Sequence, residues 1–564
     1  MERSVPLIEF HDEYSLKGGW ASSVYLNGAE VMERFAMCGA TGNLITYLTD
    51  VLHIATATAA KSLHIFHGVV TLLPLLGAFL ADAYFGRFKM IIISSLIYFF
   101  GLVMLTLSVS IIPLEYRQLA LFVSLYLVGI GYGGHKPSLQ TFGADQFNED
   151  NLKEKKAKSR FFNWWYFGTC IGSSIGMLIV FYIQESVGWV EGFAITVVAM
   201  GLGFVVFLLG RRLYRQHLPY GSPLTRIIQV FVAAIRKRRL CFSKDEYVEW
   251  NEEEEGNIQT LPRTNQFRCL DKATIIDDTD GKSVTKNAWR LCTVTQVEEV
   301  KLLLRLIPIW LSCLMYSVVL GQGSTFFIKQ GSTMDTSFRN SFHIPPASLQ
   351  IFTGLTSILF LPIYDKCFVP IARNFTGFRS GITILQRIGF GMFFSTISMV
   401  IAALVECTRI RIANENGLLD QPNKVVPMSV LWLLPQYVTL GVSNVFAAVG
   451  LQELFYDQMP NQIRSIGSAI QLSTYGIGSL LSVVVISTAQ YLSSSTGEEW
   501  LIDNLNRAHL DYYYWLLVVL STLGLCAFMG VEKCFVYKKV NGDYAFPNVR
   551  LQGVQVSYDT TSRL

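Results

Sequence analysis

Three charged residues, Glu30, Glu33 and Arg34, lie in a run from Val24 to Leu48 that otherwise has the composition of a membrane-spanning helix. Charged groups in hydrocarbon cost on the order of 2.5–3.5 kcal/mol each by insertion scales, so those that persist there usually serve a function. Spacings of three and four residues place the three side chains on one helical face. A cation between two carboxylates can take part in proton exchange, because protonating one acid frees the cation to pair elsewhere. The spacing favours a proton-coupling site, and a purely structural buried ion network is the alternative.

A fourth charge at membrane depth, Lys136, stands among glycines and directly before Pro137 in GYGGHKPS. A lysine in such a place needs either water or a carboxylate beside it. The candidate carboxylate is Glu453 in GLQELFYDQMP, in the other half of the chain. A Lys136–Glu453 ion pair would join the two halves and could open and close during transport, but spacing alone does not define it. The neighbouring His135 is better interpreted as a packing donor than as the proton site.

A charged clasp is indicated between two apolar runs, in GAFLADAYFGRFK. It combines an acid at a helix end, Asp82, with a glycine turn at Gly86 and the basic residue Arg87. Glycine lets helices approach closely, and aspartate can accept hydrogen bonds from arginine or from a neighbouring helix end. The string resembles the loop between the second and third spans of the major facilitator superfamily, and this resemblance implies a structural or gating role without contact to substrate.

These charged groups must be positioned by membrane-spanning helices. The chain has 564 residues, of which 51% are hydrophobic and 16% charged, against about 25% charged in an average globular protein. Runs of roughly 20 apolar residues predict twelve spans: 28–51, 57–81, 88–112, 118–140, 161–184, 189–213, 299–330, 346–370, 380–405, 427–456, 463–492 and 511–532. Six precede a hydrophilic segment and six follow it. The sequence therefore predicts an all-α membrane protein of two six-helix bundles, with a substrate site between them at mid-membrane.

Lysine and arginine gather on the connections after the even-numbered spans, which places those connections in the cytoplasm. We expect the central segment to be a tether, partly disordered or with one interfacial helix. The predicted divisions are a cytoplasmic N-terminus, an N-terminal bundle, a cytoplasmic linker, a C-terminal bundle and a cytoplasmic tail: 1–27, 28–213, 214–297, 298–536 and 537–564.

Six strings occur in order along the chain: GAEVMERF, GAFLADAYFGRFK, GGHKPSLQTFGADQF, FFNWWYFGTCIG, LCTVTQVEEVKLLLRLIPIW and GLQELFYDQMPNQIRSIGSA. Together they resemble the plant nitrate/peptide transporter family, proton-dependent oligopeptide transporters of the major facilitator superfamily. The resemblance covers residues from about 19 to 545. It implies the major facilitator fold and proton-coupled alternating access.

The resemblance also implies roles for single residues. Glu30, Glu33 and Arg34 match the family's proton-coupling triad, and Arg34 would also face the substrate. Lys136 matches the lysine that neutralises anionic substrate groups. The remaining two matched positions are the partner of that lysine, Glu453, and a cavity residue, Gln322.

Departures from the family pattern bear on the substrate. Cys170 replaces a usual asparagine, and Met90 replaces the phosphorylatable threonine of a dual-affinity nitrate carrier. Leu320 stands where the nitrate-binding relative has histidine, and Gly321 where bacterial peptide carriers have glutamate. These differences favour a small anionic or zwitterionic organic solute, with nitrate or a di/tripeptide as alternatives.

Aromatic residues of the fifth span, Trp164, Trp165 and Tyr166, could line a cavity for such a solute or could face lipid.

The sequence contains no phosphate-cradling glycine loop, no nucleophile constellation and no cluster of metal ligands. We therefore expect a transporter without cofactor or metal, not an enzyme or an ATP-driven pump. Its expected partners are protons, the small-molecule substrate and the lipid bilayer, with no nucleic acid, and we expect a monomer in the plasma or vacuolar membrane. A membrane receptor or scaffold that keeps the fold without transporting is the alternative from another class.

Overall fold

The computed structural model describes residues 18–147, 152–216, 223–239, 263–275, 287, 289–338, 342–376, 382–422, 424–459, 464–496 and 500–535. Helices dominate this part of the chain. Their bounds are α2 (Gly19–Thr41), α3 (Leu44–Thr46), α4 (Thr56–Leu80), α5 (Arg87–Ser110), α6 (Leu114–Ala144), α7 (Leu152–Ser186), α8 (Trp189–Leu209), α9 (Pro223–Arg236), α10 (Val294–Ser312), α11 (Leu314–Gly321), α12 (Phe326–Ser332), α13 (Ile351–Ile363), α14 (Val369–Thr376), α15 (Ile384–Glu415), α16 (Leu434–Asp457), α17 (Arg464–Thr496) and α18 (Leu510–Cys534).

The predicted spans correspond to these helices. Among the described residues, nine helices are long and apolar enough to cross a membrane, or ten if the bent pair Val294–Ser312 and Leu314–Ser332, which meet at 45°, is one span. The other two predicted spans are α2 and α6, which are less apolar because they carry the charged groups singled out above. The all-helical membrane fold is thus confirmed, with nine or ten of the predicted spans apolar enough to cross a membrane among the described residues.

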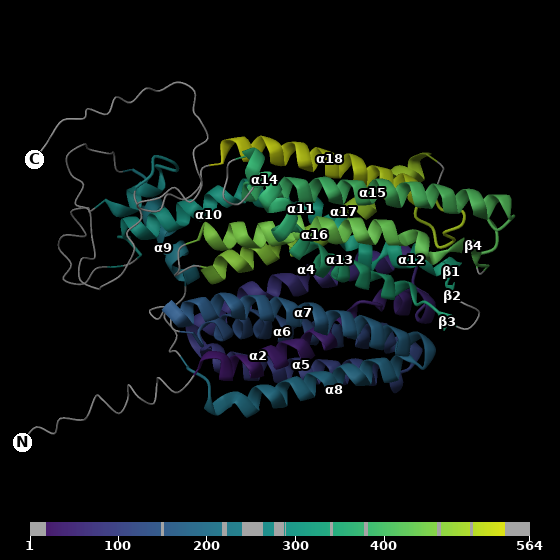
Figure 1. The fold of residues 1–564 in the computed structure, drawn as a ribbon, viewed down its shortest axis with the longest axis horizontal. Coiled ribbons are helices and arrows are strands. Elements are labelled where there is room, and N and C mark those ends of the chain that lie inside the picture. Colours follow the sequence, from purple (N-terminus) through teal and green to yellow (C-terminus); the bar gives the residue numbers. More distant parts are fainter. Residues whose placement is uncertain are drawn as a thin grey trace, which may run out of the picture.

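The helices form two bundles that lie side by side as two layers (Figure 1). In the N-terminal bundle α2 packs against α7 and α8, and α5 packs against α6. In the C-terminal bundle α15 packs against α16 and α18. The bundles meet mainly where α4 packs along α17. Two glycines permit that contact, because a Cβ at Gly68 would lie 3.1 Å from the Gly476 carbonyl oxygen and one at Gly476 would lie 3.0 Å from the Gly68 carbonyl oxygen.

The two ends of the bundles differ. At one end, called the strand end below, lie four short strands: β1 (Met334–Asp335), β2 (Ser337–Phe338), β3 (Phe342–His343) and β4 (Val426–Ser429). β1 pairs parallel with β4, and β2 pairs antiparallel with β3. The opposite end, called the linker end, carries α9 (Figure 1).

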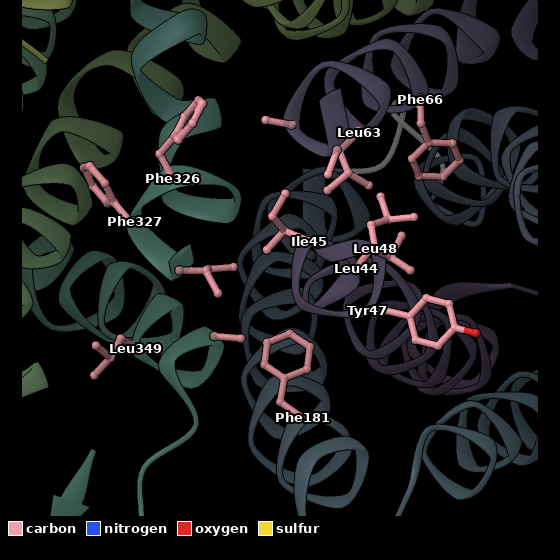
Figure 2. Packing of buried hydrophobic residues seen from close by; sticks show 14 of the residues in the cluster. Leu44, Ile45, Tyr47, Leu48, Leu63, Phe66, Phe181, Phe326, Phe327 and Leu349 are labelled. Carbon is pink, nitrogen blue, oxygen red and sulfur yellow. The ribbon is translucent and has the colours of Figure 1, made fainter. Parts of the chain in front are cut away.

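The two ends also differ in how their buried apolar residues are grouped. Towards the strand end one cluster runs through both bundles, and Figure 2 shows Leu44, Ile45 and Leu63 on one side facing Phe326 and Phe327 on the other. Towards the linker end each bundle has its own cluster, one around Phe142 and Phe161 and the other around Leu306 and Leu454. The bundles are therefore closed against each other at the strand end in this conformation.

Two helices extend beyond their predicted bounds. The predicted span 380–405 stops before Glu406, but α15 continues to Glu415 because Glu406 and Arg409 form a fully buried ion pair of 2.6 Å. Likewise α2 begins at Gly19, inside the predicted tail 1–27, because the hydroxyls of Ser22 and Ser23 donate to the Gly19 carbonyl at 2.9 Å. The tail 537–564 lies outside the described residues.

The described parts of the linker are docked onto the start of α10. Lys301 is fully buried, with its Nζ 2.5 Å from Asp271 Oδ1 and 2.7 Å from Glu298 Oε1. The Thr264 hydroxyl donates to Glu298 Oε2 at 2.7 Å. An apolar cluster beside this network joins α9 to the segment around Leu270 and to the start of α10. Its members are Val230, Ala233, Ala234, Leu270, Ala273, Cys292, Val297 and Val300. The expected tether therefore includes a packed helix and a buried ion network.

The orientation of the linker can be tested through its own cysteines. In sealed cells Cys269, which is exposed, should be protected from a membrane-impermeant maleimide and should react after permeabilisation, because the basic connections predict a cytoplasmic linker end. Cys292 should stay unreactive throughout, because burial raises the pKa of its thiol to about 11 and the thiolate is the reactive form. Tyr116→Cys, at an exposed position on the opposite side, is the control that should react from outside. Labelling of Cys269 in sealed cells would contradict the predicted topology and place the linker outside the cell.

Candidate functional site

The charges on α2 form one cluster, as their spacing predicts. Arg34 Nε lies 2.7 Å from Glu33 Oε2 and 3.4 Å from Glu30 Oε1. The carboxylate side chains are 1% exposed and that of Arg34 is 12% exposed. Helix α7 packs closely against α2 beside the cluster, since a Cβ at Gly172 would lie only 2.4 Å from the Val31 carbonyl oxygen.

Lys136 completes this cluster from α6. Its ammonium forms an ion pair with Glu30 Oε1, and the Thr169 hydroxyl on α7 donates to the same oxygen at 3.4 Å. The Tyr98 hydroxyl on α5 donates to Glu33 Oε1 at 3.3 Å. Two carboxylates and two cations thus give a formally neutral buried cluster, which is what a low-dielectric site requires of charged groups.

Some polar atoms of the cluster remain unsatisfied. Among the described residues, Glu30 Oε2, Arg34 Nη2 and His135 Nδ1 are buried and have no hydrogen-bond partner. An unpaired buried polar atom costs about 1–3 kcal/mol, and more when it is charged. The arrangement therefore offers an acceptor that a proton would satisfy and a guanidinium nitrogen that an anion would satisfy. The Arg34 guanidinium also lies over the Tyr132 ring, 5.2 Å from its centroid.

Glu453 does not pair with Lys136 in this conformation, so the pairing expected from the sequence stays a prediction for another conformation. Lys136 pairs with Glu30 in its own bundle, whereas Glu453 Oε2 lies 3.0 Å from Arg387 Nη1 in the other. Lys136 and Glu453 each have an oppositely charged residue on a neighbouring helix of their own bundle, and these nearer partners are the ones that they contact. Arg387 was not singled out from the sequence, since an arginine at the start of a span looks like an ordinary interfacial residue.

Gln322 lies inside the C-terminal bundle. Its side chain is fully buried, its Nε2 donates to the Val318 carbonyl at 2.9 Å, and its Oε1 accepts from the Tyr513 hydroxyl at 3.4 Å. In this conformation both ends of its amide are therefore bonded within the C-terminal bundle.

The charged clasp forms at the linker end with one more partner than predicted. Arg87 Nε lies 3.1 Å from Asp82 Oδ1, and its Nη1 pairs with Asp145 Oδ2 at the end of α6. Gly86 has φ +76°, a backbone conformation that favours glycine, and this turn separates α4 from α5. The clasp therefore ties three helix ends together.

Polar contacts at the strand end also cross between the bundles. Lys329 Nζ lies 2.9 Å from Asp50 Oδ1 and donates to the Thr49 hydroxyl at 3.0 Å. The Thr56 amide donates to Asp503 Oδ1 at 2.8 Å. None of these residues was a predicted site, although a lysine inside an apolar span (FFIKQG) was a visible signal. They add to the shared apolar cluster in closing the strand end.

The aromatic residues of α7 divide between two environments. Trp165 is 4% exposed and packs beside Phe161, with ring centroids 5.5 Å apart. Trp164 and Tyr166 are exposed. Trp165 therefore belongs to the core of the N-terminal bundle, and only the other two can face a cavity or lipid. Among the residues that the structure describes, no group of three or more side chains could hold a metal ion.

Comparison with known families gives a match over most of the chain. The model of the POT family (PTR2) matches residues 88–502. Protein NRT1/PTR FAMILY 5.4 of Arabidopsis thaliana is 50% identical over 533 residues, which is 93% of this chain and 96% of that protein. Protein NRT1/PTR FAMILY 5.10 of the same plant is 45% identical, covering 96% of this chain and 98% of that protein.

Solved structures show the same fold. An auto-inhibited POT family peptide transporter matches with a TM-score of 0.67 at 21% identity, covering 93% of this chain and 99% of that one. The POT family transporter PepTSo matches with a TM-score of 0.66 at 21% identity, covering 90% of this chain and 98% of that one.

Proposed function

Because this chain is a multi-pass membrane protein that belongs to the POT family of proton-coupled transporters, we propose that it is a symporter of a small anionic or zwitterionic organic solute. The transported solute and the proton would cross together by alternating access between the two bundles. The residues that we assign to proton coupling are Glu30, Glu33 and Arg34. Those that we assign to the substrate site are Arg34, Lys136, Gln322 and Glu453.

The observation that carries the proposal is the neutral buried cluster, in which Glu30 Oε2 and Arg34 Nη2 have no hydrogen-bond partner within the described part of the chain. Protonation of one carboxylate leaves the cluster with a net positive charge. An anionic group of the substrate restores neutrality by binding at Arg34 and Lys136. Proton and anion therefore favour each other's binding, which is the thermodynamic requirement for symport.

The conformation supports alternating access. The strand end is closed by the shared apolar cluster and by the Lys329–Asp50 contact. With the linker end in the cytoplasm, we infer that this is the inward-facing conformation, because the bundles share an apolar cluster only towards the strand end. For the outward-facing conformation we propose that Lys136 and Glu453 pair across the bundles, and that Asp82, Gly86 and Arg87 keep the linker ends of the helices together as the bundles rotate.

The substrate preference rests on two positions in the seventh span. Leu320 packs against apolar clusters and can donate no side-chain hydrogen bond. A Cβ at Gly321 would lie 2.7 Å from His64 Cε1, so the imidazole occupies the space that a longer side chain there would need. Leu320 therefore offers nitrate no donor beyond Arg34 and Lys136, and Gly321 offers the amine of a peptide no carboxylate. A larger organic solute gains from apolar contact, at roughly 25 cal/mol per Å² buried.

Uptake into proteoliposomes with an imposed pH gradient tests the proposal directly. We expect acid outside to drive accumulation of an organic anion or zwitterion, with nitrate and dipeptides transported at least tenfold less well at sub-millimolar concentration. Robust nitrate or dipeptide uptake without any for organic solutes would make this chain a nitrate or peptide carrier. No uptake of any compound, with the protein folded and substrate bound, would instead favour a receptor or scaffold.

The same proposal includes the protein's setting. We propose a monomer in which the segments 1–27, 214–297 and 537–564 are cytoplasmic, resident in the plasma or the vacuolar membrane.

A further inference from the structure

We propose that Arg387 is a positioning residue that holds Glu453 on its own bundle in the inward-facing conformation and releases it to Lys136 when the linker end closes. This inference rests on the proposed function, because it concerns the same transport cycle. It adds a residue to which neither the sequence motifs nor the comparisons assign a role.

The first step is that Arg387 is anchored independently of Glu453. It lies in the first turn of α15, directly after a capping box in which Thr383 and Gln386 satisfy each other's backbone amides. Its Nη2 donates to the Val445 carbonyl on α16 at 3.0 Å. Its guanidinium lies over the Tyr364 ring, 4.5 Å from the centroid. With the side chain only 10% exposed, the guanidinium is a fixed cation.

The second step is that Glu453 is the more exposed member of the pair. Its side chain is 43% exposed, against 10% for Arg387. Its ion pair with Arg387 uses Nη1 alone, whereas the Arg387 Nη2 and ring face are engaged elsewhere. Loss of the contact with Glu453 would therefore leave the carbonyl and aromatic contacts of Arg387 in place.

The third step is that the N-terminal bundle also holds its member of the proposed pair, Lys136, through a residue with other contacts, Glu30. Lys136 is held by Glu30, and Glu30 also has Arg34 at 3.4 Å and the Thr169 hydroxyl at 3.4 Å. When Lys136 leaves, Glu30 keeps these neighbours. Closure of the linker end then exchanges two ion pairs within bundles for one pair between them. Protonation of Glu30 favours this exchange, because it removes the charge that holds Lys136.

Arg387 therefore sets how readily the linker end closes. A strong hold on Glu453 keeps the transporter inward-facing, and a weak hold makes Glu453 available to Lys136. Loss of the cation should shift the balance of conformations toward the closed linker end, whereas loss of the carboxylate should remove both the hold and the pair between bundles.

The test measures the separation of the bundles rather than transport. Spin labels are placed at two exposed positions near the linker end, Tyr84 on the N-terminal bundle and Ile371 on the C-terminal bundle, with the exposed cysteines replaced. In Arg387→Gln we expect the population with the shorter distance to rise roughly fivefold or more relative to the parent, within the range of ordinary conformational coupling. Arg387→Lys, which keeps the charge but not the planar stacking, should restore part of the parent distribution.

The decisive comparison is made in the Glu453→Gln background. There Arg387→Gln should leave the distance distribution unchanged, because the group that Arg387 positions is gone. A shift of the same size in that background, or no shift in Arg387→Gln itself, would overturn the proposal. Arg411→Gln on the same helix is the matched control, since Arg411 is 71% exposed and pairs with Glu415 at the other end of α15. If Arg387→Gln fails to fold, the comparison of Arg387→Lys with and without Glu453→Gln decides in the same way.

The distances are measured without substrate or a pH gradient. Failure of this inference is therefore distinguishable from failure of the symporter proposal, which the uptake of the unmodified protein decides.

Discussion

Glu33→Gln should abolish proton-driven accumulation of substrate while sparing part of the exchange of labelled for unlabelled substrate. Both oxygens of Glu33 are engaged, Oε2 by Arg34 and Oε1 by Tyr98. A glutamine keeps the shape and can keep one acceptor, but it cannot cycle a proton. The measurement is counterflow and pH-driven uptake in the same proteoliposomes, with at least a hundredfold loss expected in the second.

Two comparisons define the meaning of that result. Glu115→Gln, at an exposed position on α6, should leave both assays unchanged. Glu30→Gln should behave like Glu33→Gln, because Arg34 contacts both carboxylates and neutralising either one alters the same cluster. Acid-stimulated accumulation at the parent level in Glu33→Gln would refute the role that we assign to this cluster.

Lys136→Gln should be the most damaging single substitution for folding among those in the cluster. It leaves Glu30, whose side chain is 1% exposed, with less compensation at membrane depth. Removing one partner of a buried pair costs about 3–5 kcal/mol, and the 13% exposure of the Lys136 side chain argues for the lower figure. The measurement is thermal unfolding and the yield of monodisperse protein in detergent.

The double variant Lys136→Gln/Glu30→Gln separates pairing from other effects. It removes both charges, so it should recover stability relative to Lys136→Gln alone, although it should not transport. Strictly additive losses would show that the two residues are not energetically coupled, and Lys136 would then act as a substrate ligand only. A double-mutant cycle between Lys136 and Glu453 should show weaker coupling than this one in conditions that favour the inward-facing conformation.

The sequence was most informative where the geometry is local. Glu30, Glu33 and Arg34 lie on one helix, and helical spacing alone places them within contact of each other. The clasp at Asp82 and Arg87 was predictable for the same reason. Its third member, Asp145, is 58 residues from Arg87 along the chain, and no local rule connects the two.

The sequence was least informative about partners on different helices. Lys136 had several acids at comparable depth, and the choice between Glu30 and Glu453 depends on how far apart the bundles stand, which is a property of the conformation. The end of α15 was missed for a related reason. Hydropathy counts Glu406 and Arg409 as two separate costs, whereas the folded chain pairs them within the protein and the helix continues.

The apolar cluster that joins the bundles at the strand end has a thermodynamic consequence. Opening that end must split the cluster and bring its side chains into contact with water. Exposure of apolar surface raises the heat capacity, so the free-energy difference between the two faces of the transporter would curve with temperature. The hydrophobic contribution to closure weakens on cooling. The resting balance between inward and outward states would therefore differ between a cold and a warm membrane even if every ion pair stayed unchanged.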